Sequence, residues 1–176
     1  MEELFNLKYF VMRGNKTEII EGENFFIPLN SQNYNWIEGE AILKKDYYII
    51  KKFFNKHALY LEGLKGINFK LNKGRVDRVI LEDLVEGFPQ ELCGLDKLNF
   101  LNLSRCKIKT IPKTIVKLKS LSELYLNDCG LERIPFNLTQ LPGLMYLSLI
   151  GNNIRDKYSK NTIDWLKREG VKVELD

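Results

Sequence analysis

One hydrophobic pattern recurs in the second half of the chain at a fixed spacing of 23 residues. One unit begins at Leu98 and reads L-x-x-L-x-L-x-x-C-x-I, and the next begins at Leu121 and reads L-x-x-L-x-L-x-x-C-x-L. A third unit begins at Leu144, and a related one begins at Val76, 22 residues before Leu98. A unit this short cannot bury its apolar side chains alone, so neighbouring units must stack into one continuous core.

The spacing within each unit predicts a short strand followed by a sharp turn. Alternate residues of a strand point to opposite faces, so Leu101 and Leu103 should face inward while their neighbours face outward. Ile108 and Ile111 then fold the chain back over the same core. Pro112 cannot continue a strand, because its ring fixes φ and removes an N–H donor. We therefore expect residues 113–118 to return along the opposite side as a short helix or irregular coil.

These units resemble the leucine-rich repeat family, with its pattern L-x-x-L-x-L-x-x-N/C-x-L, in the short intracellular type with 23-residue repeats. The resemblance covers about residues 76–155, or about four units, and Leu84 departs from it by standing in the Asn/Cys position of the first unit. It implies an α/β fold, a right-handed solenoid with a curved parallel sheet on its concave side and short helices or coil on its convex side. Cys106 and Cys129 stand in the Asn/Cys position, and we interpret them as small buried thiols rather than a redox pair.

The segments on both sides of the repeats are predicted to cap the array. Residues 46–57 form an amphipathic pattern typical of a helix, which could begin near Glu38, and a strand over 63–71 and a turn at 72–74 follow. We assign 36–75 to an N-terminal cap of helix plus strand. After the repeats, an expected helix over 160–169 and a strand over 171–175 form a C-terminal cap, residues 156–176. Ile163, Leu166 and Trp165 should pack against the last repeat.

Residues 1–35 form an N-terminal β-rich segment in this interpretation. The pattern indicates strands over 4–12, 17–20 and 25–29, with a turn at Gly14-Asn15 and a polar loop over 31–35. The segment either packs on the cap as a small β-meander or pairs with a partner.

Composition excludes several classes of protein. The formal net charge is +4, a smaller excess than a dedicated nucleic-acid-binding protein shows. Apolar runs are too short to span a membrane, and the acidic start does not resemble a secretory signal. Three cysteines without a disulfide framework favour a cytoplasmic location. There is no phosphate-binding glycine loop and no metal-ligand spacing, and His57 has no evident nucleophile. We therefore predict no enzyme activity, no cofactor and no metal.

The outward positions of the strands carry the functional prediction. Phe100, Tyr125 and Tyr146 should form a diagonal aromatic patch, and aromatic and arginine side chains dominate interface hot spots. We predict a non-catalytic module, an adaptor, scaffold or regulator, that binds a protein partner through the concave face. The expected contact residues are Arg78, Ile80, Phe100, Asn102, Arg105, Glu123, Tyr125, Asp128, Tyr146 and Ile150.

Three alternatives remain open from the sequence. Residues 1–75 could carry a ligand-binding or enzymatic role, with the repeats as a targeting module. The basic N-terminal part, with a net charge of +3 over residues 1–75, could bind RNA or another polyanion. A structural or self-association role through exposed sheet edges in residues 1–35 is the third.

Overall fold

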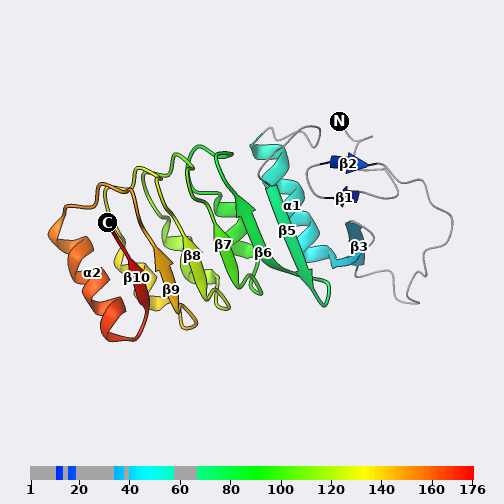
Figure 1. Cartoon of the computed structure of the whole chain (residues 1–176). Coiled ribbons are helices and arrows are strands. Elements are labelled where there is room, and N and C mark those ends of the chain that lie inside the picture. Colours follow the sequence, from blue (N-terminus) through cyan, green and yellow to red (C-terminus); the bar gives the residue numbers. More distant parts are fainter. Residues whose placement is uncertain (1–10, 14–15, 19–33, 38–39, 58–66) are drawn as a thin grey trace.

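A six-stranded sheet forms the body of the protein (Figure 1). The computed structural model describes residues 11–13, 16–18, 34–37, 40–57 and 67–176. Neighbouring strands are parallel from β6 to β10, while β5 is antiparallel to β6. In spatial order the strands are β10 (Lys172–Glu174), β9 (Tyr146–Ser148), β8 (Glu123–Tyr125), β7 (Phe100–Asn102), β6 (Arg75–Leu81) and β5 (Ile67–Asn72).

The return segments form a second layer behind the sheet, as the repeat pattern predicts (Figure 1). They are the 3-10 helices η3 (Gln90–Gly94), η4 (Lys113–Lys117) and η5 (Phe136–Gln140). Each follows a proline whose φ lies between −73° and −76°. That φ suits the start of a helical turn, and proline lacks the N–H that a continuing strand would need. The Pro89, Pro112 and Pro135 positions therefore set where the chain reverses.

The core lies between these two layers and consists of the inward positions of the repeats. Leu101, Leu124 and Leu147 stand opposite one another on neighbouring strands, and all three are fully buried. Isoleucines and leucines from the return segments, such as Ile115 and Leu138, meet them from behind and are also fully buried. The predicted inward positions of the repeats are thus confirmed.

Helix α1 (Lys44–Lys56) and a hairpin precede the first repeat. The helix buries Ile50, Phe53 and Phe54, the apolar face expected from its spacing. Strands β5 and β6 are joined through Lys73 and Gly74, whose φ values are +50° and +74°. Positive φ at both central residues is the type I′ turn that suits the twist of a two-residue hairpin.

Two sequence expectations fail just before α1. Residues 40–43 form strand β4 (Glu40–Leu43), so the helix does not begin near Glu38. Strand β4 pairs antiparallel with β3 (Tyr34–Ile37), so Tyr34 and Asn35 are not loop residues as predicted. Pairing with a second strand satisfies the backbone hydrogen bonds of both segments, and this overrides the local preference of Glu-Ala-Ile-Leu for helix.

Upstream, β1 (Val11–Arg13) and β2 (Lys16–Glu18) form an antiparallel pair on either side of the predicted turn. Residues 4–10 of the predicted strand over 4–12, and the whole predicted strand over 25–29, lie outside the described residues.

Helix α2 (Lys157–Arg168) closes the other end of the sheet and begins three residues earlier than predicted. The Asp156 carboxylate caps it by accepting the Ser159 N–H at 3.0 Å. The buried Ser159 hydroxyl accepts the Ile134 N–H at 2.7 Å, which ties the helix to the third repeat. Ile163 and Leu166 are buried as expected, whereas Trp165 is 37% exposed and packs edge-on against Phe136. Gly170, at φ +87°, then turns the chain into β10.

Candidate functional site

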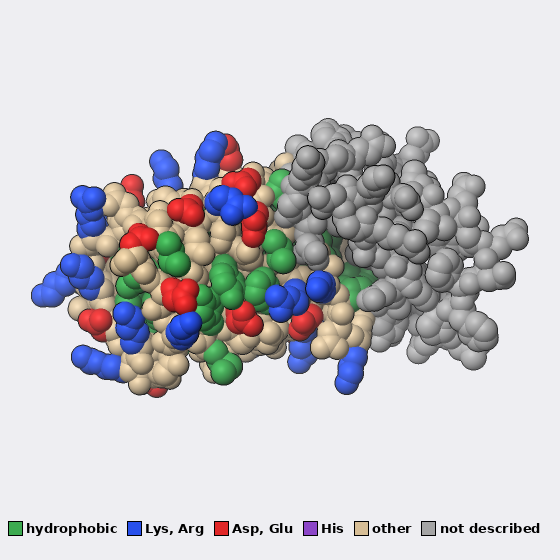
Figure 2. Space-filling model, viewed as in Figure 1, with side chains coloured by type: hydrophobic (Ala, Val, Ile, Leu, Met, Phe, Trp, Pro, Cys, Tyr) green, Lys and Arg blue, Asp and Glu red, His purple; other side chains and the backbone are tan. Residues whose placement is uncertain are grey.

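The outward face of the sheet, which we call the ladder face, presents two rows of side chains. Pairing between the strands aligns the first row as Arg78, Phe100, Glu123, Tyr146 and Lys172. The second row, two residues further along each strand, is Ile80, Asn102, Tyr125, Ser148 and Glu174. Figure 2 shows hydrophobic side chains crossing this face as a band, with acidic side chains gathered above it.

Three aromatic rings from consecutive strands contact one another on this face, with interplanar angles of 38° and 40°. The Phe100 and Tyr125 ring centroids lie 5.1 Å apart, and those of Tyr125 and Tyr146 lie 5.0 Å apart. The Arg78 guanidinium lies 3.7 Å from the Phe100 centroid, and the Lys172 amine lies 5.2 Å from the Tyr146 centroid. Both cations are within the range at which an aromatic face attracts a positive charge. We call these five residues the aromatic ladder.

Acidic side chains orient the two tyrosines. The Tyr125 hydroxyl donates to Glu123 Oε2 at 3.0 Å, and the Tyr146 hydroxyl donates to Glu174. Burial, with the bond to Glu123 as a second cause, raises the pKa of Tyr125 to about 12. The hydrogen bond to Glu174 raises the pKa of Tyr146 above its usual value. Both hydroxyls therefore stay protonated at neutral pH and serve as fixed donors rather than as acids.

A charged cluster occupies the edge of the ladder face where β6 and β7 end. Arg105 donates to the Asp83 carboxylate from Nε at 2.8 Å and to Glu82 from its terminal nitrogen. The Asn102 side-chain amide donates to Glu82 Oε1 at 2.7 Å. Asp128 does not join this cluster, because β7 lies between β6 and β8.

The turns that follow the strands share one backbone conformation. Asp83, Arg105, Asp128 and Gly151 occupy equivalent turns and have φ values of +59°, +61°, +53° and +72°. Glycine adopts this left-handed conformation without strain. At position 151 a larger residue would also clash with its neighbour, because a Cβ atom there would lie 1.9 Å from an Asp128 carboxylate oxygen. The ladder face is therefore bounded by turns of fixed shape.

The Asn/Cys position inside each turn holds the backbone of the neighbouring repeat. The Asn152 amide donates to the carbonyls of Leu126 and Leu149 at 2.7 and 2.8 Å, and its oxygen accepts from Leu131 N at 2.9 Å. The Cys106 thiol donates to the Leu81 carbonyl at 2.7 Å, and the Cys129 thiol to that of Leu103 at 3.1 Å. Both cysteines are free and buried, and burial raises the pKa of Cys129 to about 12. These thiols hold the backbone and are poor nucleophiles.

The structure places all ten predicted contact residues on strands or turns of the ladder face, and it brings the three aromatic rings together. Phe100, however, is only 7% exposed, because Arg78 and Tyr125 cover it. Sequence reasoning missed Lys172 and Glu174. Their alternation with Val171 and Val173 was a usable signal, but their place at the end of the ladder depends on pairing between β10 and β9.

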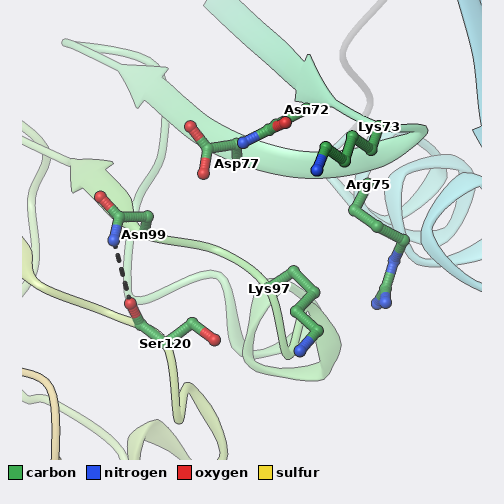
Figure 3. Close-up of a pocket in the computed structure, with 7 residues that line it drawn as sticks. All are labelled: Asn72, Lys73, Arg75, Asp77, Lys97, Asn99 and Ser120. Atoms are coloured by element: carbon green, nitrogen blue, oxygen red, sulfur yellow. Dashed lines mark hydrogen bonds between the residues drawn. The ribbon is translucent and has the colours of Figure 1, made fainter.

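Within the described part of the chain, two surface hollows lie away from the ladder. One, of about 360 Å³, lies at the edge where the strands begin, and the Lys73 and Lys97 side chains reach over it while Asp77 lies opposite them (Figure 3). Its charges are mixed, and its Asn99 and Ser120 groups bond to each other at 3.3 Å. The other hollow, of about 600 Å³, lies between the third return segment and α2. It is bordered by Phe136 and Tyr158, which are 62% and 82% exposed.

His57 packs at the end of α1 rather than in a catalytic group. Its ring centroid lies 4.9 Å from that of Phe53, and its Nε2 lies 3.7 Å from Glu91 Oε2. Burial lowers the pKa of the imidazole, so His57 is mainly neutral at pH 7. Within the described ranges, no group of three or more His, Cys, Asp or Glu side chains could hold a metal ion. In the same residues, no helix combines the length and apolarity needed to cross a membrane.

Comparison with known proteins adds one family match. The Leucine Rich Repeat family model matches residues 97–118, which include β7 and all of η4. No curated protein matches the chain. Among solved structures, a leucine-rich repeat protein from Leptospira interrogans has 31% sequence identity, and the match covers 57% of this chain with a TM-score of 0.48. The chain covers 25% of the length of that protein.

Proposed function

This chain is a leucine-rich repeat protein, and from that premise we propose that it binds a protein partner through the ladder face, as an adaptor, scaffold or regulator. Repeats of this kind build extended surfaces that suit protein recognition. The observation that carries the proposal is the aromatic ladder, in which three rings from consecutive strands lie in a row between two cations. Aromatic and arginine side chains of this kind supply most of the binding free energy at protein interfaces.

The finer architecture belongs to the same proposal. We infer that residues 76–155 form about four units of a right-handed solenoid, with the ladder face on its concave side. In this proposal residues 36–75 and 156–176 serve as caps, and residues 1–35 are assigned to an N-terminal β-rich segment. The packing of α1 against η3 and of α2 against η5 supports the capping role, because each helix covers an end of the core. Three free, buried cysteines support a reducing compartment such as the cytoplasm.

The surface around Phe136 and Tyr158 is the strongest rival within the described residues, since those side chains are more exposed than the rings of the ladder. It supplies a matched control. A Tyr125→Ala/Tyr146→Ala variant removes two ladder rings, and Phe136→Ala/Tyr158→Ala removes two rings from the rival surface.

Affinity capture from the source cell, followed by mass spectrometry, identifies the partner, and titration calorimetry then compares the two variants with wild type. We expect at least a tenfold weaker affinity for the ladder variant, because two hot-spot aromatics each contribute about 1–2 kcal/mol or more. The rival variant should bind as wild type does. Unchanged binding by a folded ladder variant, or loss of binding by the rival variant alone, would contradict the proposal.

Binding of RNA or another polyanion by the basic N-terminal part is an alternative that can be tested directly. Filter binding of single-stranded RNA to the full chain, at low and at high salt, checks for a polyanion site, which would show strong weakening by salt.

A further inference from the structure

We propose that the partner presents a positively charged polypeptide segment, whose arginine or lysine side chains bind along β8 between Glu123 and Asp128. This inference rests on the proposed function, since it names the chemistry of the partner that the ladder face binds. Three observations carry it: the distribution of charge, the pairing of each carboxylate, and the surface between the two carboxylates.

Charge is separated between the ladder face and the rest of the chain. Four basic residues lie on this face or at its edge, namely Lys70, which stands opposite Arg78 on β5, and Arg78, Arg105 and Lys172. Six acidic residues share it, namely Glu82, Asp83, Glu123, Asp128, Glu174 and Asp176. The face thus carries −2 although the whole chain carries +4, which leaves +6 on all other residues. A field of this sign attracts a cationic segment and repels a polyanion.

Several of these carboxylates already form an ion pair with a basic side chain of this chain. Arg105 pairs with Glu82 and Asp83, and Lys172 lies 2.7 Å from Glu174 Oε1. Glu123 differs, because the bond it accepts from the Tyr125 hydroxyl is neutral. Asp128 is exposed, and within the described part of the chain neither it nor Glu123 forms an ion pair. These two carboxylates are therefore the ones that can accept a cation from a partner.

The surface between the two carboxylates suits a long cationic side chain. Tyr125 lies between them in the sequence, and its ring is held by Phe100 on one side and Tyr146 on the other. The ring is only half-buried between these two neighbours, so its exposed part offers an apolar surface for an alkyl stem. Lysine and arginine pack such stems on apolar surface while their charged ends reach a carboxylate. Arginine fits best, because its planar group can bind a carboxylate through two parallel hydrogen bonds.

Fluorescence anisotropy with a defined probe tests the proposal. The probe is a fluorescein-labelled nine-residue peptide of alternating arginine and glycine, compared with one of alternating glutamate and glycine. We expect the arginine peptide alone to bind the full chain, with an affinity that falls as salt rises. A Glu123→Gln/Asp128→Asn variant should bind it about tenfold more weakly, since each exposed ion pair contributes a few-fold.

A matched variant separates a local site from bulk charge. Glu132→Gln/Asp164→Asn removes the same two charges from exposed positions, one just before η5 and one in α2. It should bind the arginine peptide as wild type does. Equal weakening by both variants, equal binding of the glutamate peptide, or no binding of the arginine peptide would each overturn the proposal. So would concentration-dependent self-association of the wild type, measured by sedimentation, that Glu123→Gln/Asp128→Asn abolishes.

The two double variants distinguish failure of the cationic-partner proposal from failure of the proposed function. If a captured partner loses affinity for Tyr125→Ala/Tyr146→Ala but binds Glu123→Gln/Asp128→Asn normally, the ladder face is the binding surface and the cationic partner is wrong. If neither variant changes partner binding, the ladder face itself is not the binding surface.

Discussion

The Asp46 carboxylate, fully buried in the first turn of α1, accepts hydrogen bonds from Arg75 Nε at 2.9 Å and from its terminal nitrogen at 3.1 Å. The same carboxylate accepts the Val76 backbone N–H at 3.0 Å, at the start of the first repeat. Arg75 also donates to Asp96, just beyond η3. Asp46, together with Arg75, therefore joins helix α1 to strand β6 of the first repeat and to the end of η3.

Replacing Asp46 by alanine should destabilise the fold by about 3 kcal/mol. The change removes the main partner of a half-buried guanidinium and leaves a buried N–H unpaired, and breaking a buried pair from one side is costly. Urea unfolding followed by circular dichroism measures the loss. Lys45→Ala is the control, because its pair with Asp96 is exposed and should contribute less than about 1 kcal/mol. Equal effects of the two variants would show that the buried pair has no special role.

The Asn152 side chain should be the most sensitive polar position within the repeats. Asn152→Ala removes two donated and two accepted backbone hydrogen bonds at once, so we expect a loss of about 2–4 kcal/mol. Asn152→Cys introduces the residue that stands at the equivalent positions 106 and 129, whose thiols donate one short bond to a carbonyl. It should lose less stability than Asn152→Ala in the same urea experiment. A ranking in the opposite order would contradict the role assigned to this position.

The buried Cys129 thiol predicts a loss of stability at alkaline pH. Burial raises its pKa in the folded protein from about 9 to about 12. The unfolded chain releases the thiol proton first, so this contribution is complete below about pH 9 and declines as pH rises towards 12. The difference in unfolding free energy between wild type and Cys129→Ala should therefore shrink between pH 8 and pH 10.5. Other groups titrate in both proteins, so their effects cancel in this difference. A difference that stays constant from pH 8 to pH 10.5 would therefore refute the assignment.

The sequence predicted the features that depend on local spacing, namely the inward leucines, the reversal at each proline and the outward rings. Features that depend on distant pairing were not predictable. Asp46 looks like an exposed helix residue until Arg75, 29 positions later, packs beside it. Lys172 joins the ladder only because β10 pairs with β9. The burial of Phe100 depends on Arg78, which belongs to the neighbouring strand.

That burial gives Phe100 a different role from the other two rings. Phe100 is 7% exposed beneath Arg78 and Tyr125, whereas Tyr125 and Tyr146 are only half-buried. Phe100→Ala should therefore cost about 2–3 kcal/mol of stability, because it leaves a gap beneath the guanidinium and removes one aromatic contact. Tyr146→Ala should cost about 1 kcal/mol, since its ring already contacts solvent. Thermal unfolding of the two variants measures the contrast. If they lose equal stability, Phe100 is an ordinary surface ring and belongs in the binding test beside the tyrosines. If the contrast holds, only Tyr125 and Tyr146 can be changed to test binding without also weakening the fold.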